Sequence, residues 1–298
     1  MKYLLLGGSG FIGSHLAKKL SKDNFVAVAG RNKKDNSTSF YYHEVDFTNC
    51  KDFSNLIAEY DVIIHLVSTI LPSENLQNIN QEITDNVFPS VILLKNIIDL
   101  NKQLVFISSG GTVYGDSNKP KAETDNTNPI CNYGISKLFI EKYINLYNYY
   151  YSKKFKIIRL ANPYSEETFR GRKQGIIPII IDNTLSGKET EIYGKNQTRD
   201  YIYIDDAISG ILSVLDYRGN QTIFNIGTGI GHTIEQIISL IEDKLGKKCK
   251  ISYSSPRKCD VQNNVLDISL IKNETNWHPK TSLSQGIDTI LEKIQGRI

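Results

Sequence analysis

Three spaced glycines near the start of the chain constrain its fold more than any other feature. Gly7, Gly10 and Gly13 follow the short apolar run of residues 2–6, and apolar residues at helical spacing follow them. This order predicts a strand, a tight turn and a helix. In such a unit the first glycine permits a sharp turn, the second lets backbone amides approach a pyrophosphate, and the third lets the helix pack against the strand. The helix N-terminus adds aligned N–H groups and a partial positive charge.

The glycine turn therefore predicts a dinucleotide site. Its contacts would include Phe11 and Ile12, which lie between the second and third glycines. The alternative is a strand–helix turn that binds nothing. The motifs further along the chain favour the binding site.

Composition fits an ordinary soluble globular protein. At 298 residues, with 40% hydrophobic and 22% charged residues, the chain is long enough for one large or two modest domains. A net charge of +3 is too small to indicate nucleic acid or an anionic membrane as a partner. We expect a cytoplasmic protein, because the apolar N-terminal run is too short for a signal peptide or membrane span. Its four cysteines are scattered, which suits a reducing compartment.

Apolar strands alternate with helical stretches through the first half of the chain. Residues 25–29, 61–67 and 103–108 read as strands, and residues 61–67 are almost continuously apolar, as a strand buried on both faces should be. A helical stretch is expected from about residue 73 to residue 100, with a kink or break at Pro89. The alternation predicts a parallel sheet with helices on both faces.

The end of the second strand bears on which dinucleotide is bound. An acid there would bond the ribose 2′-hydroxyl of NAD, whereas an arginine would accommodate the 2′-phosphate of NADP. Here Gly30 occupies the acid position, and Arg31 and Asn32 follow it. NADP is favoured and NAD stays open, because a solvated basic loop would give the same residues. Further cofactor contacts are expected at three positions near strand ends, namely Asp46, Phe47 and Leu66.

Tyr133 and Lys137 form the candidate proton-transfer pair. They are four residues apart at the start of an expected helix and so share one face. An ammonium beside a phenol favours the phenolate, so Lys137 is expected to lower the pKa of Tyr133 from about 10. Such a tyrosine can move protons near neutral pH. An ordinary surface pair would share the spacing, but the glycine turn upstream favours the catalytic interpretation.

These motifs together resemble the extended short-chain dehydrogenase/reductase family, and within it the nucleotide-sugar epimerases and dehydratases of the UDP-glucose 4-epimerase type. The resemblance covers essentially the whole chain. The segments that carry it are the glycine turn, residues 108–115, the Tyr133–Lys137 pair, and residues 159–164, 175–178, 199–206, 224–229 and 256–260.

The resemblance implies roles for single residues. Tyr133 would be the general acid and base, and Lys137 would bond the nicotinamide ribose. Arg199 and Arg257 would grip the diphosphate of a nucleoside diphosphate sugar, in keeping with the match between guanidinium and phosphate, and Asn162 would contact the sugar or its phosphate. By themselves the two arginines could equally be solvated surface residues. Relatives pair through helices near residues 143–151, which makes a homodimer the expected assembly.

Two departures from the family pattern concern the loop after residue 108. Relatives place a serine or threonine where this chain has Gly110, so Ser109 or Thr112 would have to substitute for it. The 4,6-dehydratases carry an Asp-Glu pair where this chain has Gly111 and Thr112. Dehydration needs an acid and a base there, so we do not expect a dehydratase.

We therefore expect an α/β protein with a Rossmann-type doubly wound parallel sheet and a small C-terminal α/β substrate lobe. Residues 1–162, with a return of about 205–226, would bind NAD or NADP, and residues 163–298 would form the interleaved substrate lobe. The expected function is 4-epimerisation of a UDP-hexose or UDP-N-acetylhexosamine by hydride transfer at C4. The alternatives are NADPH-dependent reduction of a nucleotide-activated 4-keto-6-deoxy sugar and, less favoured, a non-catalytic NADP-sensing protein.

Overall fold

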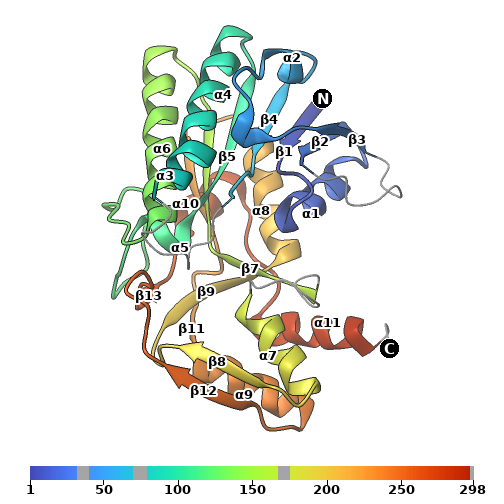
Figure 1. The fold of residues 1–298 in the computed structure, drawn as a ribbon, viewed down its shortest axis with the longest axis vertical. Coiled ribbons are helices and arrows are strands. Elements are labelled where there is room, and N and C mark those ends of the chain that lie inside the picture. Colours follow the sequence, from blue (N-terminus) through green and yellow to red (C-terminus); the bar gives the residue numbers. More distant parts are fainter. Residues whose placement is uncertain (32–39, 70–78, 167–174, 296–298) are drawn as a thin grey trace.

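The computed structural model describes residues 1–31, 40–69, 79–166 and 175–295 (Figure 1). A large upper part contains the main sheet between two layers of helices, and a smaller lower lobe lies beyond the carboxyl ends of the strands of that sheet. None of the helices in these ranges is long and apolar enough to cross a membrane.

Seven parallel strands form the main sheet, in the order β10-β6-β5-β4-β1-β2-β3. In chain order they are β1 (Lys2–Leu6), β2 (Phe25–Gly30), β3 (Tyr41–Glu44), β4 (Val62–His65), β5 (Gln103–Ser109), β6 (Lys156–Leu160) and β10 (Ile223–Ile226). The order reverses at β1, which is the hallmark of a doubly wound sheet. The predicted Rossmann-type fold is confirmed.

Helices cover both faces of this sheet, and each face has its own hydrophobic core. Leu4 of β1 packs with residues of α2 (Ser54–Ile57), α4 (Phe88–Asp99) and α6 (Asn132–Tyr150). Its neighbour Leu5 packs on the opposite face, with α1 (Phe11–Leu20) and α8 (Ile204–Asp216). Because successive side chains of a strand point to opposite faces, a strand buried on both faces must be apolar throughout.

The helical stretch before β5 differs from the one that the sequence predicts, which has its kink or break at Pro89. It consists of α3 (Ile79–Glu82), a π-helical turn η3 (Ile83–Val87) and α4. The irregularity precedes Pro89, which lies in the first turn of α4, where a proline is tolerated. In the π turn the Phe88 N–H donates to the Ile83 carbonyl. Residues 73–78 of the predicted helix lie outside the described residues.

Within the described residues, the lower lobe contains short strands and three helices. Its helices are α7 (Ile176–Leu185), α9 (Ile234–Leu245) and α11 (Leu283–Gln295), and its strands β8 (Glu189–Tyr193) and β12 (Lys250–Ser254) pair in parallel. A second small sheet centres on β9 (Thr198–Tyr203), which pairs with β7 (Asn162–Tyr164), β11 (Gly231–Thr233) and β13 (Asn263–Asn264).

The chain crosses between the two parts more than once. After β9 it returns to the upper part, where α8 packs against α1 and β10 becomes an edge strand of the main sheet. A later helix, α10 (Ser269–Thr275), packs on both α8 and β10, so the return is not confined to residues 205–226. The core under α1 and α8 also continues into the lower lobe through Ile177, Ile237 and Ile287. We therefore propose two interleaved lobes that share one core.

Candidate active site

The glycine turn has the geometry that a dinucleotide diphosphate requires. Gly7 adopts a φ of +78°, and a Cβ on Gly13 would lie 2.6 Å from the Gly8 Cα. A side chain at either position would therefore be strained or excluded. Gly10 begins α1 without a side-chain cap, so the first N–H groups of the helix are not covered by a capping side chain. Phe11 and Ile12 start the helix and are partly buried.

The end of β2 carries no acid. Gly30 ends the strand; a Cβ there would lie 3.0 Å from the Ser9 Oγ, and its carbonyl accepts a hydrogen bond of 2.6 Å from the Tyr42 hydroxyl. Arg31 follows, exposed, and its charge helps to lower the pKa of Asp46. Gly30, the residue before Arg31, therefore lies beside Ser9 of the glycine turn. Asn32 lies outside the described residues.

The other residues predicted to contact the cofactor, Asp46, Phe47 and Leu66, each interact with nearby parts of the protein. Asp46 caps the short helix η1 (Phe47–Asn49) by accepting from the Thr48 N–H at 3.1 Å, and its bonds to Thr48 lower its pKa. The Phe47 ring is buried against Phe53, so its side chain belongs to the core. Leu66 follows β4 and donates its N–H to the Leu6 carbonyl at 2.9 Å, close to the turn at Gly7.

Tyr133 and Ser109 meet at the end of the sheet. Ser109 is the last residue of β5, and Tyr133 lies in the first turn of α6. Their side chains share a hydrogen bond. Cys131 caps α6 by accepting from the Gly134 N–H at 3.4 Å, which fixes the turn that carries Tyr133.

Lys137 lies one helical turn further along, on the same face of α6. Its ammonium is 5.6 Å from the centre of the Tyr133 ring. It donates to the Ile107 carbonyl at 3.0 Å and to the Val67 carbonyl at 3.5 Å, so it reaches the ends of β5 and β4 together. Burial lowers its pKa to about 8, and the charges of Glu82 and Glu141 oppose this shift.

The expectation of a depressed Tyr133 pKa is wrong. Burial raises the pKa of the phenol, the charges of Cys131 and Glu82 raise it further, and the bond to Ser109 opposes them. The reason is positional: the Lys137 ammonium is turned toward backbone carbonyls. A positive charge arriving with a ligand would act in the opposite direction.

Ser109, rather than Thr112, contacts the tyrosine. Gly110 has no room for a side chain, since a Cβ there would lie 2.6 Å from the Leu266 Cδ1 and 3.0 Å from the Arg159 carbonyl. Thr112 lies in the short helix α5 (Gly110–Val113), and its buried hydroxyl has no hydrogen-bond partner among the described residues.

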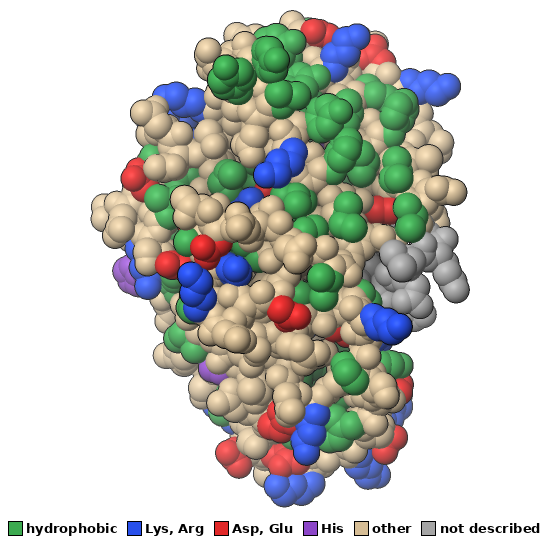
Figure 2. All heavy atoms as spheres, turned by 90° about the vertical axis from the view of Figure 1, so that its left-hand side faces the viewer, with side chains coloured by type: hydrophobic (Ala, Val, Ile, Leu, Met, Phe, Trp, Pro, Cys, Tyr) green, Lys and Arg blue, Asp and Glu red, His purple; other side chains and the backbone are tan. Residues whose placement is uncertain are grey.

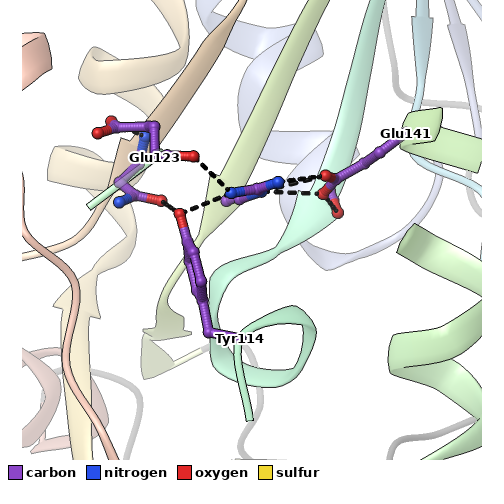
Figure 3. Close-up of polar contacts among 6 residues, drawn as sticks. Tyr114, Glu123 and Glu141 are labelled. Atoms are coloured by element: carbon purple, nitrogen blue, oxygen red, sulfur yellow. Dashed lines mark hydrogen bonds and ion pairs between the residues drawn. The ribbon is translucent and has the colours of Figure 1, made fainter. Parts of the chain in front are cut away.

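A buried ionic cluster links Glu141 of α6 to residues of the sheet (Figure 3). Glu141 follows Lys137 by one more turn and accepts from the Arg159 guanidinium at 2.7 Å and from the Ser108 hydroxyl at 2.5 Å. Arg159 also donates to the Tyr114 hydroxyl at 2.8 Å, which in turn donates to the Asn225 Oδ1 at 2.8 Å. Burial lowers the pKa of Arg159, but the bonds to Glu141 outweigh burial and raise it overall. The cluster joins α6 to β5, β6 and β10.

Asn162 begins β7 and lies near the loop after β5. Its side-chain amide donates to the Asp200 carbonyl at 2.9 Å. A Cβ on Gly111 would lie 3.5 Å from the Asn162 Oδ1 and 3.8 Å from the Ser109 Oγ. Asn162 and Ser109 therefore flank the space above Gly111, beside Tyr133.

The two predicted diphosphate arginines lie in the lower lobe. Arg199 of β9 donates to the carbonyls of Thr198 at 3.0 Å and Gln262 at 3.2 Å, and burial lowers its pKa. Arg257, in the loop between β12 and β13, stacks over the Tyr193 ring with 3.9 Å from its central carbon to the ring centre. Gln262, whose carbonyl accepts from Arg199, lies in the same loop as Arg257. Both arginines are therefore associated with the loop between β12 and β13. Neither forms an ion pair with the described residues.

Known proteins with the same architecture act on nucleotide sugars. The model of the NAD-dependent epimerase/dehydratase family matches residues 3–227. The chain belongs to that family. It is 32% identical to a dTDP-4-dehydro-6-deoxyglucose reductase of Escherichia coli, across 98% of this chain and 97% of the relative. It is also 32% identical to a putative UDP-glucose 4-epimerase of Methanocaldococcus jannaschii, across 97% of this chain and 96% of that protein.

Solved structures of two relatives agree with the fold, and both were determined with a nucleotide sugar bound. The UDP-glucose 4-epimerase of Thermotoga maritima, solved with UDP-glucose, superposes with a TM-score of 0.92 at 29% identity and covers 100% of this chain and 99% of its own. The UDP-glucuronic acid 4-epimerase of Bacillus cereus, solved with UDP-glucuronic acid and NAD, gives 0.89 at 26% identity, with both chains covered completely. The family member described here is thus an enzyme of the extended short-chain dehydrogenase/reductase family.

Several residues of this epimerase-family site were not predicted from the sequence. Glu82, Glu141 and Arg159 are buried around the Tyr133–Lys137 pair. The only available signal was spacing, because Glu141 continues the four-residue repeat of Tyr133 and Lys137 along one helix face. No group of three or more potential metal-ligating side chains occurs in the part of the chain that the structure describes.

Proposed function

We propose that this enzyme transfers a hydride at C4 of a nucleotide-activated hexose, and that it does so as a 4-epimerase of a UDP-hexose or UDP-N-acetylhexosamine. The observation that carries the proposal is the contact of Ser109 with Tyr133, with Lys137 one turn away at the carboxyl end of β5. That edge of an open parallel sheet is where such folds bind ligands. The relatives named as 4-epimerases support the choice of reaction.

Each residue would perform one task in the reaction. Tyr133 takes the proton of the C4 hydroxyl, and Ser109 shares a hydrogen bond with the reacting phenol. Lys137 leaves its carbonyl partners for the ribose hydroxyls of the cofactor, which brings its charge toward the phenol. Asn162 holds the sugar or its phosphate, and Arg199 and Arg257 hold the diphosphate. A bound nicotinamide supplies the hydride acceptor.

Reduction of a nucleotide-activated 4-keto-6-deoxy sugar is the second candidate. Two observations favour it: the reductase relative from Escherichia coli and the absence of an acid at the end of β2. A guanidinium at Arg31 suits the 2′-phosphate of NADP, the cofactor of net reductions. NAD remains the cofactor in the solved complexes of the relatives.

One assay separates the two reactions. Purified enzyme is incubated with UDP-glucose and, separately, with a dTDP-4-keto-6-deoxy sugar plus NADPH, while nicotinamide absorbance is followed and the products are analysed. The 4-epimerase forms the C4 epimer with no net change in nicotinamide. Stoichiometric NADPH loss with the keto sugar, without epimer from UDP-glucose, would establish the reductase instead.

The NADP preference rests on Arg31 and has its own test. Arg31→Ala should weaken NADP binding about 10-fold or more, the loss expected for one charge-assisted bond to a phosphate. NAD binding should change little. Equal weakening of both, measured by calorimetry, would remove the 2′-phosphate argument.

We also propose a homodimer through α4 and α6. These helices expose large apolar side chains on one side of the molecule, and hydrophobic side chains gather over the upper part of that side (Figure 2). Phe88 is 61% exposed and Tyr149 is 81% exposed. Phe139→Glu with Leu146→Glu should turn a dimer into a monomer in light scattering. Leu185→Glu, on the exposed surface of α7, is the matched control.

A further inference from the structure

Asn264 is a fully buried amide that the proposed mechanism does not use. It ends the short strand β13, and its exposed fraction is 0%. Its Nδ2 donates to the Gly110 carbonyl at 3.0 Å, whereas its Oδ1 has no hydrogen-bond partner among the described residues. A buried polar atom without a partner costs about 1–3 kcal/mol of stability. The amide is therefore better explained by a function than by its contribution to stability.

The Gly110 carbonyl lies next in the chain to the hydroxyl that contacts Tyr133. Gly110 directly follows Ser109, and Ser109 shares a hydrogen bond with the Tyr133 side chain. Gly110 is itself buried, and the space beside its Cα is filled by Leu266, two residues after Asn264. A shift of the backbone at Gly110 would therefore move the Ser109 side chain relative to the phenol.

The strand that carries Asn264 is fastened to both parts of the molecule. On one side β13 pairs with β9 of the lower lobe, where Asn264 is the register partner of Arg199. On the other side Asp116, which follows α5 in the upper part, accepts from the Asn263 N–H at 3.1 Å. β13 lies where the two parts meet (Figure 1). Asn264 thus joins the strand of a predicted diphosphate arginine to the backbone beside Ser109.

We propose that Asn264 is a positioning residue, which fixes the backbone after Ser109 and so keeps the Ser109 hydroxyl on Tyr133. The inference rests on the proposed function, because it takes Tyr133 as the group that exchanges a proton with the sugar. A misplacement of about 1 Å at a reacting site can cost about 100-fold in rate. Because Asn264 acts through Ser109, its amide should matter only while the Ser109 hydroxyl is present.

A double-mutant cycle tests this dependence through kcat for the C4 epimer, measured with UDP-glucose and NAD. Asn264→Leu keeps a similar volume but removes the donor, and should lower kcat about 10-fold, as expected when one hydrogen bond to the reacting group is misaligned. KM should stay within about 2-fold, because substrate binding is not what the amide supports. In Ser109→Ala the same change should lower kcat by less than about 2-fold, because the hydroxyl that it positions is gone.

The neighbouring residue of β13 provides the matched control. Asn263 bonds Asp116 and Ser117 through its own backbone N–H and carbonyl, so Asn263→Leu keeps these bonds and should show wild-type kcat. Urea unfolding checks that each variant is folded. Asn264→Ala also removes the donor, and it replaces Asn264→Leu in the cycle if the larger side chain prevents folding.

Three outcomes would overturn the inference: independent, multiplying losses from Asn264→Leu and Ser109→Ala, wild-type kcat in both Asn264 variants, or failure of both variants to fold. In each case, epimer formed by the wild type leaves the proposed function standing. If the wild type consumes NADPH with the keto sugar and forms no epimer, the 4-epimerase is rejected, and the same cycle on NADPH consumption decides the role of Asn264. A wild type inactive in both assays would overturn the two proposals together.

Discussion

Arg159 and the pair Arg199 and Arg257 carry the same guanidinium group in opposite surroundings. The side chain of Arg159 is 4% exposed, and its donors are used by Glu141 and Tyr114. Arg199 donates to two backbone carbonyls, and the guanidinium of Arg257 lies over the Tyr193 ring. Within the described residues neither of these two meets a carboxylate. Arg159 thus uses its N–H groups to stabilise the fold. Arg199 and Arg257 have no acidic partner among the described residues and can bind an anionic ligand.

The largest expected difference between Arg159 and Arg199 is in the free energy of unfolding when each is replaced by methionine. Arg159→Met leaves the Glu141 carboxylate buried without its ion-pair partner, which should lower the free energy of unfolding by about 3–5 kcal/mol. Arg199→Met should lower it by less than about 1 kcal/mol, because only backbone carbonyls lose a donor. Urea unfolding of the two variants measures the difference. Similar losses in both would show that Arg159 is no more structural than Arg199.

The next largest effect is expected in the turnover number, from replacing Tyr133 on α6, the helix that the Glu141–Arg159 ion pair joins to the sheet. Tyr133→Phe should lower kcat about 100- to 10,000-fold, the range expected for loss of a general acid and base. Cofactor binding and the unfolding midpoint should stay close to those of the wild type. Tyr149→Phe removes a hydroxyl from the exposed end of the same helix and is the control. Retained turnover in Tyr133→Phe would remove the tyrosine from the chemistry.

The lobe arginines should affect binding rather than turnover. Arg257→Met or Arg199→Met should raise KM for the nucleotide sugar and the dissociation constant of UDP about 10- to 100-fold, because each loses a charge-assisted bond to phosphate. The affinity for NAD should not change. Arg218→Met, which removes an exposed arginine bonded to the Leu215 carbonyl, serves as the control. A loss of UDP affinity as large in this control would make the effect one of overall charge.

The same contrast explains what could be predicted from the sequence. The glycine turn and the Tyr133–Lys137 pair follow from spacing within one strand–helix unit or one helix, so local pattern was sufficient for them. The choice of Ser109 depended on Leu266, which comes from far along the chain and fills the space beside Gly110. The effect of Lys137 on Tyr133 was predicted wrongly because burial is a property of the assembled fold. The π turn before α4 also depends on tertiary bonds from Asn86 and Ser90.

The smallest expected effect concerns two lysines whose pKa burial lowers to about 8, Lys137 and Lys156. In the unfolded chain a lysine keeps its proton up to about pH 10.5, so between pH 8 and 10.5 the unfolded state binds more protons than the folded one. Stability contributed by each lysine should therefore rise with pH across that window, by at most about 1.4 kcal/mol per pH unit. Below pH 8 both states are charged and the slope vanishes.

Single-residue variants show how much each lysine contributes to the pH dependence of the unfolding free energy. Relative to the wild type, Lys137→Met and Lys156→Met should each lose part of the rise in unfolding free energy between pH 8 and 9.5, measured in urea. Lys156 lies away from the glycine turn. Its ammonium lies over the Tyr217 ring and donates to the Gln221 carbonyl. NAD should therefore change the slope carried by Lys137 and leave that of Lys156 alone. If NAD altered both slopes equally, the proposal that Lys137 exchanges its carbonyl partners for the cofactor would be wrong.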